Sequence, residues 1–568
     1  MTSTPISLTD RSRKLAGEFL HSVVIVDDEA QFQARAAKDV PVAPPPVASS
    51  ADGPAKPPEM GASVQSGLER PALITPTPQQ LQAAREEPAD SHDLDAKQVT
   101  DGFAKKGIVC AVLRPEPEEV AGLAAIPALM RADIIVLDWV LFKDLSGDGT
   151  LKVISSVLAT ETDRLRLIAI YTGQKDLGAI TDKLATLVSA LEGPETFQRV
   201  DTFTVARGPI RLAVFAKANT DMPPGDAALA ARVTTSSELP EKLLQEFGQM
   251  TEGLVAQVTV ASLAALRKNT HRILRRLSPS LDAAYLWHRA TQVHPIDAQE
   301  HLRSIVVDEM ESVLVDEAVD SRADLDAIQA WMTVRTPVDS EFTARFGVNN
   351  PVTRADVVEL LEKGVPSRGK HVKFPTLSVR TRKDRCFSES EESNTRANEK
   401  FAMLLSLQSH YRPPHPALTL GTILRLTATP ATYWVCVQPV CDAVRLKDST
   451  SFPLVPLVLP KDDEGFDIIV QADDAVLRLR LNSDPSRIHM ERFTPNLSAG
   501  RVMASEENRE AEKRKALWFF SADGGSRYDW LGELKPQHAL AISGKVAAKL
   551  GRVGLVESEW LRRWHDRD

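Results

Sequence analysis

The stretch HSVVIVDDEA (residues 21–30) joins a short run of apolar residues directly to two adjacent aspartates. The run is continuous rather than alternating, which is typical of a strand that is covered on both faces of its sheet. Asp27 and Asp28 follow at its carboxyl end, where two like charges repel and raise each other's pKa. We therefore expect another group, brought close by the fold, to compensate their charge.

Four further apolar runs alternate with helical patterns after this strand. The strands are predicted at GIVCAVLRP (107–115), ADIIVLDWVL (132–141), RLIAIYTG (166–173) and RLAVFAKA (211–218). The helices between them are predicted at 117–130, 149–160 and 177–193. Alternation of this kind predicts an α/β domain with a doubly wound, parallel, five-stranded sheet, which we place at residues 1–235.

Residues 34–96 interrupt this pattern with a Pro-, Ala- and Ser-rich segment that includes VPVAPPPVASSADGPAKPP. Such a composition cannot bury enough apolar surface to offset the entropy lost on ordering. We predict a disordered insertion inside the domain rather than a linker between domains, because the first strand needs the later ones as partners.

Polar residues end most of these strands, and ligands of open parallel sheets bind at that edge. The set is Asp27, Asp28, Asp138, Thr172 and Lys217. The three carboxylates form an oxygen-rich site suited to Mg²⁺, which would offset their mutual repulsion. Asp138 could then attack a phosphoryl group, Lys217 could neutralise charge on the phosphoryl oxygens, and Thr172 could hydrogen-bond to the attached group.

This set, in this strand order, resembles the receiver domain of two-component response regulators. The resemblance implies that Asp27 and Asp28 bind Mg²⁺ together with Asp138, and that Asp138 accepts phosphate from a histidine kinase. It also implies that Thr172 and Lys217 respond to the phosphorylated state. The GDG sequence at 147–149 resembles the turn that follows the phosphoacceptor in that family.

The spacing of the acids agrees with the resemblance once the insertion is removed. Asp28 and Asp138 are 110 residues apart, and without the 63 residues of 34–96 the separation is 47. That length fits a β-α-β-α-β segment with short loops. The sequence departs from the family at Ala218, where receivers usually carry proline after the lysine, and in a longer loop after Asp138. Phe215 is the candidate for the aromatic switch residue.

The rest of the chain divides into two further regions. Residues 236–335 have helical patterns and are predicted to form a connector, whose apolar spacing allows a homodimer through a coiled-coil seam. Residues 336–568 contain short β-type runs at 421–427, 432–439, 453–460, 466–471 and 476–482 and end in helical segments. We predict a C-terminal α+β output region, whose activity no motif reveals.

Composition narrows the class of protein and its partners. The formal net charge of −9 gives no overall signature of nucleic-acid binding, although local basic runs leave it open. Four scattered cysteines form no disulfide framework, and neither a signal peptide nor a membrane span is visible. We therefore expect a cytoplasmic protein.

Together these features predict a response-regulator-like signalling protein in which Asp138 is a phosphoacceptor rather than the nucleophile of a turnover enzyme. The alternative is a receiver-like interaction module that is not phosphorylated and acts as a scaffold in a larger assembly. The chain also resembles divergent receivers with large C-terminal regions, a class with suspected roles in phage defence. A phosphatase of the haloacid-dehalogenase type is disfavoured, because Val140 stands where that class carries a second acid.

Overall fold

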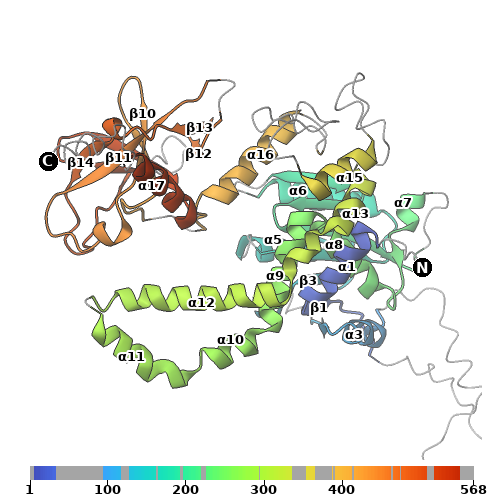
Figure 1. The fold of residues 1–568 in the computed structure, drawn as a ribbon. Coiled ribbons are helices and arrows are strands. Elements are labelled where there is room, and N and C mark those ends of the chain that lie inside the picture. The colour runs from blue at the N-terminus through green and yellow to red at the C-terminus, as the bar shows by residue number, and fades with distance from the viewer. Residues whose placement is uncertain are drawn as a thin grey trace, which may run out of the picture. The chain divides into compact units, whose positions relative to one another are not determined.

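The computed structural model divides the chain into two compact units, Met1–Val334 and Arg335–Asp568 (Figure 1). The residues that it describes are 6–32, 94–116, 127–160, 164–191, 196–218, 220, 226–292, 294–335, 353–364, 387, 391–411, 415–461, 465–473, 475–507 and 517–550. Most of the predicted insertion, one of the local basic runs (residues 370–383) and the last predicted helical segment lie outside these residues.

Five parallel strands form the centre of the N-terminal unit, as predicted. They are β1 (Ser22–Val26), β2 (Val109–Leu113), β3 (Ile134–Leu137), β4 (Arg166–Thr172) and β7 (Ile210–Lys217), in the spatial order β2-β1-β3-β4-β7. This is the doubly wound order of flavodoxin-like sheets. The apolar runs found in the sequence therefore mark the strands, whose ends lie within four residues of the predicted ones.

Three short strands enlarge this sheet beyond the predicted five. A hairpin of β5 (Phe197–Asp201) and β6 (Thr204–Arg207) adds antiparallel to β7. The two-residue strand β8 (Val233–Thr234) pairs in parallel with Ala216 and Lys217 of β7. A strand of two residues leaves no periodic signal in a sequence, so β8 was not predicted.

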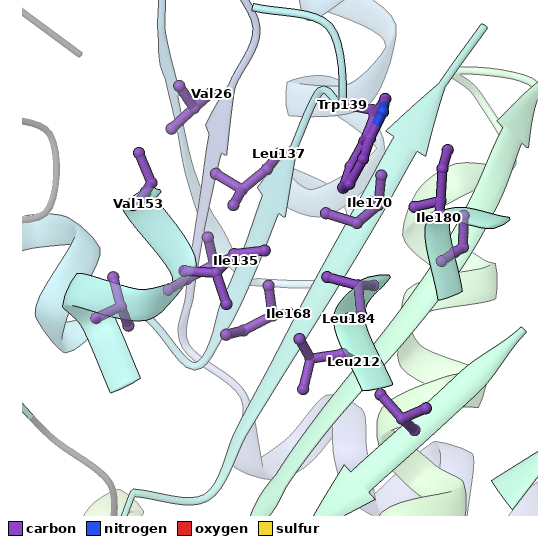
Figure 2. Close-up of a cluster of buried hydrophobic side chains, with 14 of the residues drawn as sticks. Val26, Ile135, Leu137, Trp139, Val153, Ile168, Ile170, Ile180, Leu184 and Leu212 are labelled. Carbon is purple, nitrogen blue, oxygen red and sulfur yellow. The ribbon is translucent and has the colours of Figure 1, made fainter. Parts of the chain in front are cut away.

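Helices cover both faces of the sheet. One face carries α4 (Pro127–Arg131), α5 (Asp148–Thr160) and α6 (Leu177–Ser189). Figure 2 shows the core on this side, where strand residues that include Val26, Leu137 and Ile170 meet helix residues that include Val153, Ile180 and Leu184. Because side chains alternate along a strand, Val23 and Ile25 instead face the opposite layer.

The opposite face carries α1 (Leu8–Phe19), α3 (Ala96–Ala104) and α8 (Leu239–Met250). Helix α8 lies in the segment assigned to the connector, yet Leu239, Leu243 and Phe247 are fully buried against the sheet. Its apolar stripe therefore completes the core of the α/β unit and is not free to form a seam between two chains.

The start of α3 corrects one boundary of the predicted insertion. Leu94 is buried at 1% exposure, and Asp95 caps α3 by accepting a hydrogen bond from the backbone N–H of Gln98. Residues 94–96 thus belong to the folded domain. A capping aspartate and one leucine are too short a signal to stand out against the polar segment before them.

A helical region follows α8 within the same unit. It comprises α9 (Leu254–Lys268), α10 (Thr270–Arg276), α11 (Asp282–Thr291), α12 (Asp297–Asp316) and α13 (Leu325–Arg335). Helices α10 and α11 lead away from α9, and α12 leads back (Figure 1). A break at Thr251–Gly253 separates α8 from α9.

The C-terminal unit is built on an antiparallel sheet with helices, in agreement with the predicted α+β class. Its described strands follow the order β12-β13-β11-β10-β9-β17-β16-β15, and β14 pairs with β11. Their bounds are β9 Thr422–Leu426, β10 Thr432–Cys436, β11 Thr450–Val458, β12 Ile468–Ala472, β13 Ala475–Leu481, β14 His489–Phe493, β15 Ser505–Glu507, β16 Leu517–Ser521 and β17 Arg527–Glu533. The helices are α15 (Arg354–Lys363), α16 (Glu391–Ser406) and α17 (Pro536–Leu550), and α17 covers one face of the sheet.

No helix in the described part of the chain combines the length and the apolar composition needed to cross a membrane.

Candidate functional site

The sheet order brings the predicted acids of the first and third strands together. Val26 of β1 pairs with Leu137 of β3, so that Asp27 and Asp138 leave neighbouring strands at the same level. Both residues are nearly buried, with exposures of 2% for Asp27 and 7% for Asp138. Two carboxylates in this position need a counter-charge within the fold.

Lys217 supplies that counter-charge from the end of β7. Its Nζ atom lies 3.0 Å from Oδ2 of Asp27 and 2.7 Å from Oδ2 of Asp138, and the side chain is 3% exposed. Strand β4 separates β7 from β3, and neighbouring strands lie about 4.8 Å apart, so only a long side chain spans the distance. Lysine combines this reach with a positive charge.

Asp28 points to the loop that follows Asp138. Its Oδ2 atom accepts a hydrogen bond of 2.9 Å from the backbone N–H of Phe142, which has a positive φ of 54°. Its Oδ1 atom is buried and has no hydrogen-bond partner among the described residues. A buried carboxylate oxygen without a donor is costly, and a bound cation would satisfy it.

Thr172 ends β4 between the two strands that carry Asp138 and Lys217. It is fully buried and pairs with Ala216, the residue before Lys217. Its Oγ1 atom accepts a hydrogen bond of 3.1 Å from the backbone N–H of Gln174. The strand register thus places the threonine beside the ionic cluster, without a hydrogen bond to its carboxylates among the described contacts.

Two residues outside the predicted ionic set hold the site in place. The Thr150 hydroxyl, at the start of α5, donates to the backbone carbonyl of Asp138 at 2.7 Å. Gly147, with a φ of +75°, lies against the Trp139 ring so closely that a Cβ would overlap it. The GDG turn was recognised in the sequence, but only the structure shows that its first glycine makes room for the residue after Asp138.

Tyr171 connects the site to β8. Its hydroxyl donates to the backbone carbonyl of Thr234 at 3.0 Å, and the Lys217 ammonium lies 5.6 Å from the centre of its ring. Phe215, the switch residue expected from the sequence, lies in the same buried cluster as Tyr171, with the Arg232 guanidinium over its ring. Of these two aromatic residues, Tyr171 on β4 is the one whose ring contacts the Lys217 ammonium. Its position in a continuous apolar run gives no sequence signal for this contact.

Electrostatics make Asp138 the unusual acid of the cluster. Burial, which the ammonium of Lys217 opposes and the charge of Asp27 reinforces, raises the pKa of Asp138 to about 6. Burial alone would lower the pKa of Lys217, but attraction to Asp138 and Asp27 raises it above its ordinary value. Counted formally, three carboxylates and one ammonium carry a charge of −2, which matches a divalent cation.

The carboxylates are not arranged as metal ligands in this structure. Among the described residues, no group of three His, Cys, Asp or Glu side chains is arranged to hold a metal ion. The Lys217 ammonium bridges Asp27 and Asp138, while Asp28 is turned to the Phe142 amide. The donor set and its charge fit Mg²⁺, but binding would require the carboxylates to reorient.

The raised pKa of Asp138 predicts a pH-dependent stability. Because the folded pKa lies above the unfolded value, folding takes up a proton between about pH 4 and pH 6, and stability falls as the pH rises through that window. The slope from one group is at most about 1.4 kcal/mol per pH unit. Urea unfolding in the presence of a chelator, repeated between pH 4 and pH 7, measures the change of the unfolding free energy with pH. The Asp138→Asn variant should lose the part of that change that Asp138 causes. A difference between wild type and variant that does not change with pH would contradict the assignment.

A scan against protein-family models matches residues 19–221 to the response receiver domain. The N-terminal domain is a divergent receiver domain. Searches of the curated proteins and of the solved structures returned no significant match. The receiver match covers the parallel sheet through β7 and includes all five predicted site residues. It indicates a response-regulator-like signalling function for the protein.

Proposed function

We propose that the receiver domain is phosphorylated on Asp138 by a partner histidine kinase. The observation that carries this proposal is the Lys217 ammonium held between Asp27 and Asp138 at the carboxyl edge of the sheet. Lys217 places a positive charge beside the Asp138 carboxylate. Its side chain is long enough to move with a phosphoryl oxygen once that group is attached. Receiver domains generally interact with kinases, which makes a phosphohistidine the natural donor.

Transfer would form a bond between an Asp138 carboxylate oxygen and phosphorus while the bond from phosphorus to the donor nitrogen breaks. The imidazole leaves and takes up a proton. Asp138 must be ionised to attack, and a pKa of about 6 leaves it mostly ionised at neutral pH. The Lys217 ammonium can exchange its contact with Asp138 for one with a phosphoryl oxygen, and the Thr172 hydroxyl can donate to another.

Mg²⁺ is the proposed cofactor, held by Asp27, Asp28 and Asp138. When bound, it would neutralise part of the charge that gathers on the phosphoryl oxygens. The support lies in the formal charge of −2 of the set and in the buried Oδ1 atom of Asp28, which has no hydrogen-bond partner among the described residues. Asp138 is then a phosphoacceptor in a relay rather than the nucleophile of a turnover enzyme.

The signal would leave the site through Lys217 and its neighbours. Lys217 pairs with Thr234 of β8, and Tyr171 donates to the carbonyl of the same residue. If Lys217 shifts toward a phosphoryl group, the contacts that hold β8 and the start of α8 change with it. The C-terminal unit is proposed to be the output region, with an activity that its described residues do not specify.

A small phosphodonor tests the proposal directly. Incubation of the full chain with phosphoramidate and Mg²⁺ should add one phosphoryl group, in an adduct that is stable to acid and labile to hydroxylamine. Asp138→Asn should abolish it, whereas Asp144→Asn, a partly exposed acid in the loop after the site, should not. Intact-mass spectrometry provides the measurement.

The same experiment separates the alternative, a receiver-like scaffold that is not phosphorylated. The nearly complete burial of Asp138 and Lys217 is the observation that favours this alternative, because a closed ionic cluster resists entry of a donor. If the wild type forms no adduct while a known receiver is labelled in parallel, the phosphoacceptor proposal is contradicted and the scaffold alternative is favoured.

A further inference from the structure

The segment from α10 to α12, residues 270–316, exposes an unusual amount of apolar surface. We call it the helical arm. No residue of α10 or α11 is buried, and in α12 only Ala298 and Val313 are. Its exposed large apolar residues are Leu274, Leu281, Leu286, Trp287, Ile296, Leu302, Ile305, Val307, Met310 and Val315.

The helical arm lacks a core of its own to hold its helices. Helix α10 has seven residues and α11 has ten, and isolated helices of this length are marginal in water. Of the five apolar clusters found among the described residues, none contains a side chain of α10 or α11, and Leu314 alone from α12 packs at the edge of one. Packing against another surface would supply the missing stabilisation.

Charges are segregated along the helical arm. The last turn of α9 is basic, and so is α10. Their basic residues are Arg267, Lys268, Arg272, Arg275 and Arg276. The second half of α12 is acidic, with Asp308, Glu309, Glu311, Asp316 and Glu317 next to its end. Where the two face each other they pair, at 3.3 Å between Arg276 and Glu309 and at 3.1 Å between Lys268 and Glu317.

Two outward faces of the helical arm match each other. Leu274 and Arg275 are exposed on α10, and Val307, Met310 and Glu311 are exposed on α12. The α12 residues share one face by their i, i+3, i+4 spacing. Neither Arg275 nor Glu311 lines the groove between α10 and α12, so both lie away from the pairs already made inside the chain. Helix α10 thus exposes one large apolar side chain next to a positive charge, α12 exposes two beside a negative charge, and the two charges are opposite.

We propose that the helical arm is a two-fold interface between two copies of this chain. In a two-fold interface every contact occurs twice. Helix α10 of the first copy can therefore lie against α12 of the second copy, while α12 of the first copy lies against α10 of the second. Leu274 then packs near Met310 of the second copy, and Arg275 pairs with its Glu311. A second copy is the occupant because the complementary charge and apolar faces are both present on this chain.

Sedimentation velocity of the full chain over a range of concentrations tests the proposal. The wild type should form a dimer, and Asp138→Asn should dimerise equally, because the interface does not depend on phosphoryl chemistry. The double variant Leu274→Glu/Met310→Glu should raise the dimer dissociation constant at least tenfold. Leu497→Glu, at an exposed apolar position in the C-terminal unit, serves as the control and should leave the dimer unchanged.

Charge reversal identifies the pairing more sharply. Arg275→Glu and Glu311→Arg should each weaken the homodimer, because each places like charges opposite one another. A mixture of the two variant chains should associate again, since both contacts then join opposite charges. A wild-type chain that stays monomeric up to about 100 µM would overturn the proposal. So would a dimer that none of the arm substitutions weakens.

Discussion

Replacing Lys217 with methionine should lower the free energy of unfolding of the receiver domain by about 3–5 kcal/mol. The substitution keeps the length of the side chain but leaves Asp27 and Asp138 buried side by side without their shared ammonium. An uncompensated buried charge is among the largest penalties that a single substitution can introduce. Urea unfolding at pH 7 with a chelator present measures the loss.

Two further measurements separate charge from packing at this position. Adding Asp138→Asn to the Lys217→Met variant should restore part of the stability, because it removes one of the unpaired charges. Lys183→Met is the matched control, since the Lys183 ammonium lies on the surface, 5.5 Å from the Trp139 ring centre, and donates a hydrogen bond to the Ser146 carbonyl. A loss below about 1 kcal/mol for Lys217→Met, similar to that of the control, would show that the cluster is not a buried ion pair.

Replacing Glu246 of α8 with alanine should destabilise the domain by a similar amount, about 3–5 kcal/mol. Glu246 accepts from Nε of Arg211 at 2.7 Å and from a terminal nitrogen of Arg232 at 2.8 Å, and its side chain is 6% exposed. Its loss would leave the buried Arg211 guanidinium without its carboxylate partner, and Arg232 would keep only its pair with Asp201. Because Arg211 lies on β7 and Arg232 directly precedes β8, the same change should loosen α8 from the sheet.

Glu241 on the same helix provides the control for Glu246. Its carboxylate pairs with Lys106 and Arg13 but is 44% exposed, and solvent screens such pairs. Glu241→Ala should therefore cost less than about 1 kcal/mol by the same urea unfolding measurement. Equal effects of the two substitutions would mean that α8 is held to the domain by its apolar face alone.

The sequence by itself determined the parallel sheet and the residues at its carboxyl edge. Continuous apolar runs such as Val23–Val26 indicate doubly covered strands, and a polar residue that ends such a run must lie at the strand end whatever the tertiary arrangement. The family match over residues 19–221 confirms the receiver resemblance that Asp27, Asp28, Asp138, Thr172 and Lys217 carried. Whether these residues bind Mg²⁺ and transfer phosphate stays a prediction.

Only the tertiary structure decided which surfaces those segments bury. An apolar stripe on α8 has the same period whether it packs on its own sheet or on another chain, so periodicity alone could not assign it to the receiver core. The contacts of Lys217 with Asp27 and Asp138 join residues 190 and 79 positions apart, and β8 is too short to leave a pattern. Burial, ion pairing and strand register are properties of segments distant in sequence, and no local pattern contains them.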